Sequence, residues 1–222
     1  MSSMPIPTRL FHMTACNNLE SILNSGALLC KNSTSVNGIA YENIAHTTIQ
    51  NRRSAKAIPI PPCGVLHDYV PFYFAPRSPM LYAINQGNVD GCDYRQDDII
   101  YFQTTVQSLN ENGSLYIFSD RNATLEYALF ENDYDQLSQM INWNYITSSP
   151  SLDGYCRYFH TTSQYPERGE IRQAELLIYR QLALNHIQSI GVYNQNTLEI
   201  VNELLSRYHY NLPVSIQSAW YF

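Results

Sequence analysis

Residues 64–82, GVLHDYVPFYFAPRSPMLY, predict a strand that is followed directly by a helix. Val70–Phe74 is rich in aromatic and β-branched residues, which favour a strand. Pro71 cannot donate a ladder hydrogen bond, so it confines this strand to a sheet edge or to a strand start. Ser78 as N-cap and Pro79 in the first turn are a strong helix-start signal, and Gly87 ends the helix.

On both sides of this stretch the chain alternates between short strands and short helices. Hydrophobic spacing predicts further strands at 9–14, 98–106, 115–118, 173–179, 187–193 and 214–217. It predicts further helices at 17–26, 41–56, 125–130, 134–141 and 197–208. The polar segment 32–37 and the Pro- and Gly-punctuated segment 147–170 are expected to be irregular. With neither a repeat nor a linker, residues 1–222 are expected to form one mixed α+β domain.

The charge balance excludes a protein that coats nucleic acid through general phosphate neutralisation. The chain carries 13 Lys and Arg against 19 Asp and Glu, a net charge of −6. Phosphate neutralisation needs a surplus of cations, so any nucleic-acid contact must be local. The 18 tyrosines suit either the core of a small domain or a surface that grips planar ligands, and composition does not decide between them.

The cysteines and histidines give no sign of a metal site. The five cysteines contain no CxxC pair, and the six histidines lack metal-ligand spacing. No apolar run approaches the roughly 20 residues that cross a bilayer, and no secretory leader is recognisable. We therefore expect a metal-free protein of the reducing cytoplasm, without membrane contact. GxGxxG, P-loop and GxSxG motifs are also missing.

Glu175 is the most unusual residue of the predicted strands. It lies within an apolar strand, where a buried carboxylate without a partner would be costly. A solvated strand edge would explain it more simply. However, the segment that leads into it is aromatic and basic, with Tyr158, Phe159, Arg168 and Arg172, as expected of a loop that grips a substrate.

Three other groups are candidates, and each has an ordinary structural explanation. His12, with Thr14 on the same strand, is either a ligand contact or a packed core histidine. Arg52 and Arg53 are either functional or a solvated helix face, and at most one of them can point into a single cleft. Arg77 to Met80 are explained by helix capping alone.

Taken in order, these segments resemble the DarT family of DNA ADP-ribosyltransferase toxins. The resemblance covers nearly the whole chain and is strongest in the middle string. It rests on His12-Met13-Thr14, Asn18-Leu19, Ile22–Gly26, Ile39–Tyr41, Gln50–Arg53, Gly64–Tyr82, Phe118–Arg121 and Gln173–Leu177.

The resemblance implies a fold, a reaction and a partner. The fold is that of ADP-ribosyltransferases related to the poly-ADP-ribose polymerases, with a split, mostly antiparallel sheet flanked by helices. The reaction transfers ADP-ribose from NAD to ring N3 of thymidine in single-stranded DNA, in a sequence-dependent way. The partner is a DarG antitoxin whose macrodomain removes the modification, so the protein would be the toxin of a toxin–antitoxin pair.

The resemblance also assigns residues. Arg53 and Glu175 fall on the catalytic positions. Positions that hold NAD are His12, Met13, Thr14, Ser21, Leu29 and Arg53. Positions that contact DNA are Arg77, Ser78, Pro79, Met80, Leu81, Tyr82, Tyr158, Phe159, Arg168 and Arg172.

This chain departs from some relatives at Asn122, where they have His after the Asp120-Arg121 pair. Guanine, RNA or protein acceptors, a non-catalytic single-strand-binding module, and simple NAD hydrolysis are the alternatives to thymidine modification.

Overall fold

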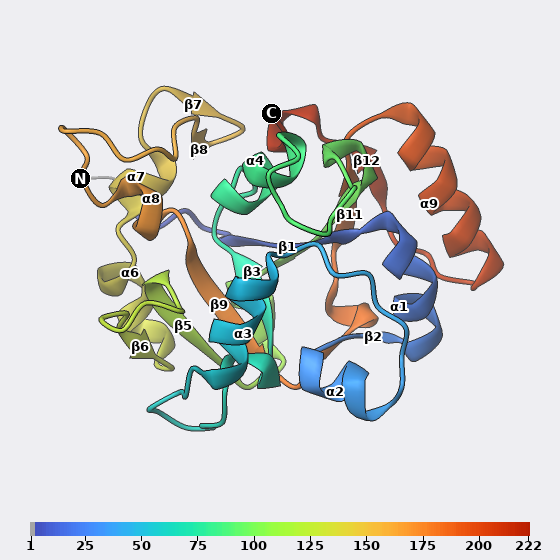
Figure 1. The fold of residues 1–222 in the computed structure, drawn as a ribbon, viewed down its shortest axis with the longest axis horizontal. Coiled ribbons are helices and arrows are strands. Elements are labelled where there is room, and N and C mark those ends of the chain that lie inside the picture. Colours follow the sequence, from blue (N-terminus) through green and yellow to red (C-terminus); the bar gives the residue numbers. More distant parts are fainter. Residues whose placement is uncertain (1–2) are drawn as a thin grey trace.

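An eight-stranded sheet organises the structure, a computed structural model that describes residues 3–222 (Figure 1). The strand order is β12-β11-β4-β1-β3-β9-β5-β6, and all neighbours are antiparallel except β11 and β12. Two small sheets, β10-β2 and β7-β8, complete it. The strands are β1 Arg9–Ala15, β2 Ala27–Leu29, β3 Tyr69–Tyr73, β4 Ile99–Thr105, β5 Tyr116–Asn122, β6 Phe130–Glu131, β7 Ser151–Leu152, β8 Tyr155–Cys156, β9 Ala174–Tyr179, β10 Gln181–Ala183, β11 Ser189–Val192 and β12 Val214–Ile216. The mostly antiparallel α+β fold is therefore confirmed.

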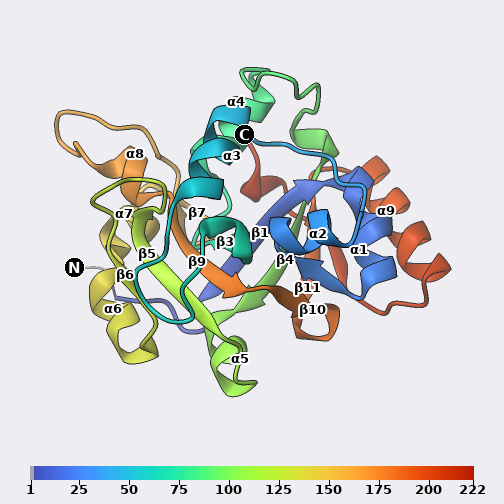
Figure 2. The same cartoon turned by 60° about the horizontal axis from the view of Figure 1, so that its bottom comes forward.

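Short helices surround this sheet. They are α1 Leu19–Ser25, α2 Lys31–Val36, α3 Thr47–Ala55, α4 Pro79–Asn85, α5 Val106–Glu111, α6 Leu137–Met140, α7 Trp143–Thr147, α8 Arg168–Ile171 and α9 Gln195–Arg207. Single 3-10 turns lie at η1 Cys16–Asn18, η2 Leu66–Asp68, η3 Gln96–Asp98, η4 Tyr134–Gln136, η5 Leu184–His186 and η6 Ser218–Trp220. Both views place α1 and α9 at one end of the molecule and α6, α7 and α8 at the other (Figures 1 and 2).

The middle strands are apolar because helices and loops cover both of their faces. Ile99, Ile100, Tyr101 and Phe102 of β4 are each 0% exposed. Continuous burial of this kind replaces the alternation of a half-exposed strand. This core holds the edges of β1 and β3 in place.

The sheet splits between β1 and β3, which share only the Phe11–Tyr73 pair. Beside this pair the strands diverge, and the Nδ1 atom of His12 lies 2.8 Å from the carbonyl oxygen of Pro71. Because N–H and C=O of one residue point to the same side in an antiparallel ladder, the missing N–H of Pro71 also faces the split. The prediction that Pro71 lies at an edge or a strand start was wrong, because β3 is an interior strand. Proline is tolerated there because no hydrogen bond toward β1 is needed at the split.

The helix-start prediction at Ser78 is confirmed. The Ser78 hydroxyl accepts a hydrogen bond from the Leu81 amide at 3.1 Å, and Pro79 is the first residue of α4. The end of α1 is confirmed as well, because Gly26 adopts a left-handed φ of 68°. In both places a local signal determined the element.

Four segments differ from the predictions. Residues 41–46 are irregular and not helical, because the Asn18 side chain pairs with both backbone groups of Glu42, at 2.7 and 3.0 Å. Residues 125–130 form no helix, because Phe130 pairs with Ser119 at the edge of the sheet. Residues 31–36 form α2 instead of a loop, with the Cys30 sulfur as N-cap. Finally, the 147–170 segment contains β7, β8 and the start of α8.

Candidate functional site

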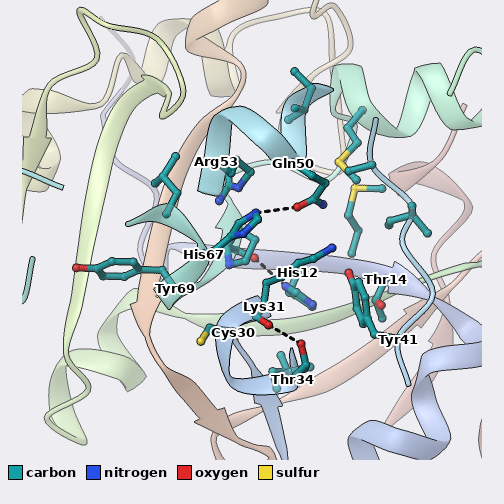
Figure 3. Close-up of a pocket in the computed structure, with 18 of the residues that line it drawn as sticks. His12, Thr14, Cys30, Lys31, Thr34, Tyr41, Gln50, Arg53, His67 and Tyr69 are labelled. Atoms are coloured by element: carbon teal, nitrogen blue, oxygen red, sulfur yellow. Dashed lines mark hydrogen bonds between the residues drawn. The ribbon is translucent and has the colours of Figure 1, made fainter. Parts of the chain in front are cut away.

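A cavity of about 320 Å³ opens where the sheet splits (Figure 3). The strands β1, β3 and β9 meet there, and residues of α3 and α2 line it from either side, with α3 above and α2 below in this view. It is lined by both predicted catalytic residues and all predicted NAD-binding residues, namely His12, Met13, Thr14, Ser21, Leu29, Arg53 and Glu175. The fold thus brings together side chains that lie up to 163 positions apart in sequence, the difference between 12 and 175.

Arg53 and Glu175 form an ion pair within this cavity. Arg53 Nη1 donates to both carboxylate oxygens, at 3.0 Å to Oε1 and 2.9 Å to Oε2. Glu175 is 2% exposed, because β9 lies between β3 and β5, so the solvated-edge explanation was wrong. Arg52 is exposed on α3, which agrees with the expectation that only one of the two arginines can enter a cleft.

The Arg53 guanidinium has a free donor. Its Nη2 atom is buried and has no hydrogen-bond partner within residues 3–222. A buried N–H without a partner is costly, so such a group points to a ligand that accepts from it.

Two neighbours fix the position of Glu175. Its backbone amide donates to Ser119 Oγ on β5 at 3.3 Å. Tyr73 lies opposite it in the β3–β9 register, and burial together with the Glu175 charge raises the pKa of Tyr73. Tyr73 also lines the cavity, and the sequence reasoning missed it although it belongs to the segment 64–82.

His12 is held as a neutral ring in one tautomer. The Pro71 carbonyl can only accept, so Nδ1 carries the proton and donates to it at 2.8 Å. Burial lowers the pKa of His12 to about 4, so the ring is uncharged at neutral pH. Nε2 is left as a hydrogen-bond acceptor.

Residues of α2, α3 and the neighbouring segments add polar groups to the cavity that the sequence reasoning missed. His67 Nε2 lies 2.9 Å from Gln50 Oε1, and the Lys31 ammonium lies 5.4 Å from the centroid of the Tyr41 ring. Burial lowers the pKa of His67 and of Lys31 and raises that of Tyr41. The sequence predicted the helix that contains Gln50, but it predicted residues 32–37 of the α2 region to be a loop.

Near Glu175, Asn122 and Gln173 also line the cavity. Asn122 Nδ2 donates to Gln173 Oε1 at 2.8 Å. The Asn122 side chain also accepts from the Thr124 amide at 3.0 Å, which fixes its orientation. The position where this chain departs from some relatives therefore belongs to the site.

Outside the cavity, three predicted DNA-contact arginines form a cationic cluster. Arg168 and Arg172 are 5% and 1% exposed, and Arg172 donates to the carbonyl oxygens of Arg77 and Ile146 at 3.0 Å each. Within residues 3–222 none of the three forms an ion pair with a carboxylate, and each keeps a buried Nε without a partner. Burial lowers the pKa of Arg172 to about 10, so it stays charged at neutral pH.

The other predicted DNA-contact residues differ in exposure. Ser78 and Leu81 are each 0% exposed, so their side chains cap and pack α4 and offer no surface to a strand. Pro79 and Met80 line the cavity, whereas Tyr82 packs against Phe159 with ring centroids 5.3 Å apart. Phe159 is buried at 5% exposure, but Tyr158 is 53% exposed.

Two kinds of site were not found in the part of the chain that the structure describes. No group of three or more His, Cys, Asp or Glu in residues 3–222 could hold a metal ion. In the same range, no helix is both long enough and apolar enough to pass through a membrane.

The chain matches known proteins along its whole length. A family model described as "ssDNA thymidine ADP-ribosyltransferase, DarT" matches residues 11–222. A protein of Thermus sp. (strain 2.9) named "DNA ADP-ribosyl transferase" is 36% identical, over 98% of this chain and 98% of that protein.

Two solved structures of Thermus sp. 2.9 DarT have the same fold. The complex with ADP-ribosylated ssDNA has a TM-score of 0.88 and 34% identity, covering 100% of this chain and 99% of that one. The complex with NAD+ has a TM-score of 0.83 and 33% identity, covering 98% of this chain and 99% of that one. The match to the family model, the sequence identity and the shared fold show that this chain belongs to the DarT family of ADP-ribosyltransferases.

Proposed function

We propose that this protein transfers the ADP-ribose of NAD to ring N3 of thymidine in single-stranded DNA. The observation that carries the proposal is the buried Arg53–Glu175 pair, whose guanidinium keeps an unused donor inside the cavity. The pair supplies a negative charge and a hydrogen-bond donor at one place. Glycosyl transfer to a weakly acidic nitrogen needs both.

Glu175 would stabilise the sugar. When bound, NAD supplies an anomeric carbon that gains positive charge as its bond to nicotinamide breaks. Ser119 holds the Glu175 backbone amide and Arg53 holds the carboxylate, so the carboxylate can accept from a ribose hydroxyl and offset that charge without reorganising.

The opposite side of the cavity would hold the dinucleotide. His12 offers Nε2 as an acceptor for a hydroxyl, and its ring stays neutral because its pKa is about 4. Met13, Thr14, Ser21 and Leu29 line the same cavity and would form its binding surface. A Thermus sp. 2.9 DarT has been solved in complex with NAD+, which supports this use of the cavity.

Arg53 would stabilise the thymine as it reacts. A guanidinium has a pKa above about 12, so it serves as a donor and not as a base. In the balanced reaction the new bond takes the N3 electron pair, nicotinamide leaves with the pair of the broken bond, and the N3 proton passes to water. Arg53 Nη2 would donate to the thymine anion and lower the cost of that proton loss.

The DNA strand would be held by a few contacts to its phosphates and by stacking of its bases on aromatic side chains. Arg77 is half-buried and has no carboxylate partner within the described residues, which suits a phosphate, whereas the buried Arg168 and Arg172 would add positive charge nearby. Exposed Tyr158 offers a ring to a base, worth about 1–3 kcal/mol. Local contacts of this kind agree with the net charge of −6.

Mass analysis of a short oligonucleotide tests the reaction. A strand with one thymidine is incubated with NAD and the protein, and we expect a mass gain of one ADP-ribosyl group on that nucleotide. The matched control carries N3-methylthymidine at the same position and should stay unmodified. Transfer to a guanine-only strand, to RNA or to protein, or NAD hydrolysis alone, would overturn the thymidine assignment.

We also propose that the protein acts as a toxin with a DarG-type macrodomain antitoxin as partner, because the family resemblance implies both. Induced expression should block DNA replication, and co-expression of such a macrodomain should restore growth. The Glu175→Gln variant should be harmless without it. Equal growth arrest by wild type and variant would contradict a toxic activity of this site.

A further inference from the structure

Phe222 touches three candidate DNA-contact residues. Its ring centroid lies 5.2 Å from that of Tyr82 on α4 and 5.2 Å from that of Phe159, in the loop before α8. The guanidinium carbon of Arg77 lies 4.3 Å from the same centroid, which is within cation–π range. One ring therefore packs between α4 and the loop.

The backbone of Phe222 is itself anchored to the large sheet. Its amide donates to Gln96 Oε1 at 2.8 Å, and its carbonyl accepts from Gln96 Nε2 at 2.7 Å. Gln96 is 6% exposed and lies in η3, directly before β4. Arg77 Nη1 also donates to the Tyr221 carbonyl. The turn η3, which leads directly into β4, thus holds the backbone of Phe222.

Residues 220–222 also contact the turn between β7 and β8. Trp220 Nε1 donates to Asp153 Oδ2 at 2.8 Å, and Arg9 Nη1 binds the same oxygen at 2.9 Å. Asp153 lies in the turn between β7 and β8. Both ribbon views show this end of the chain close to α4 (Figures 1 and 2). Residues 220–222 thus contact the 151–160 region at two points.

We propose that Phe222 is a positioning residue for the DNA half of the reaction, holding Arg77 where a single strand meets it and packing against the buried ring of Phe159. The inference rests on the proposed function. Phe222, Arg77 and Phe159 do not belong to the residues that line the NAD-candidate cavity. Loss of the ring should therefore weaken the use of DNA and leave NAD binding unchanged.

Three variants separate this role from a general structural one. Phe222→Ala removes the ring, Phe222→Tyr keeps it, and Ile216→Ala changes a 43% exposed side chain on β12 as the matched control. For each variant we would measure the KM of a thymidine-bearing strand, the Kd of NAD and the salt dependence of strand binding.

For Phe222→Ala we expect KM for the strand to rise about tenfold, because small displacements of positioning groups are costly. The slope of log affinity against log salt should fall by about 0.7, the value for one phosphate contact on a single strand. The Kd of NAD should stay unchanged. Phe222→Tyr and Ile216→Ala should match wild type in all three measurements.

The possible failures can be told apart. If wild type does not modify the strand, the proposed function fails. If wild type modifies it and Phe222→Ala keeps the wild-type KM, the positioning role is wrong. A parallel rise in the Kd of NAD, or the same defect in Phe222→Tyr, would also refute it, because either result would mean a general loss of structure.

Discussion

The substitution Glu175→Gln tests the centre of the site most directly. It keeps the shape of the side chain and one acceptor oxygen but removes the charge. In the wild type Arg53 Nη1 donates to both carboxylate oxygens, at 3.0 and 2.9 Å. In the variant one of these contacts is replaced by an amide N–H₂ group, which cannot accept. Removal of one preorganised electrostatic group costs about 10²–10³ in rate, or roughly 2.7–4 kcal/mol. We expect kcat to fall by about that factor.

The effect on stability should be smaller. Breaking a fully buried ion pair costs about 3–5 kcal/mol. The Arg53 side chain is 13% exposed, and the Gln oxygen still accepts one hydrogen bond, so we expect about 2 kcal/mol. For a chain of 222 residues this corresponds to a fall in Tm of about 4–8 °C. The variant should therefore be folded at 25 °C.

The assay combines single-turnover transfer to a thymidine-bearing strand with calorimetric binding of NAD. The Kd of NAD should change by less than about threefold, because a neutral acceptor remains. Glu203→Gln, on the exposed face of α9, is the matched control and should behave as wild type. A folded Glu175→Gln protein with kcat within about tenfold of wild type would refute the electrostatic role.

Three further predictions concern other parts of the structure. Arg53→Lys keeps a charge near Glu175 but loses the Nη2 donor, so transfer should fall about 100-fold with little change in Tm, and an active variant would contradict the donor role. The pKa of His12 is lowered from 6.5 to about 4, so between these pH values the unfolded chain binds a proton that the folded one does not. The contribution of His12 to the free energy of unfolding is complete above pH 6.5 and should fall by up to about 3 kcal/mol as pH drops to 4. In His12→Gln, Tm should therefore decrease less steeply over this pH range. The same slope of Tm against pH in variant and wild type would exclude His12 as the cause. In Gly191→Ala the new Cβ would clash with the Trp220 ring, so overpacking should lower the free energy of unfolding by about 1–3 kcal/mol in urea denaturation. Wild-type stability would show that the ring can move.

The sequence predicted elements whose signals are local. The Ser78-Pro79 start of α4 and the apolar run of β9 each depend on neighbouring residues, and both were confirmed. It also placed Glu175 in a strand, but not in the interior of the sheet. Burial depends on which strands lie on either side, and a single strand pattern does not contain that information.

Long-range pairing explains the errors. The Asn18 side chain binds the backbone of Glu42 and keeps residues 41–46 out of a helix, and Phe130 joins β5 as a sheet edge. In α2 a sulfur N-cap starts a helix in a polar segment of low helix propensity. The Arg53–Glu175 contact joins residues 122 positions apart, and only the resemblance to a family indicated it beforehand.

The single Phe11–Tyr73 pair divides the large sheet into two leaves of four strands each. One leaf carries His12, and the other carries Glu175 together with Asn122. Under the proposed function both leaves therefore hold NAD, with His12 from the first leaf and Glu175 from the second. The distance between the two leaves, and not either leaf alone, would then determine how the dinucleotide fits.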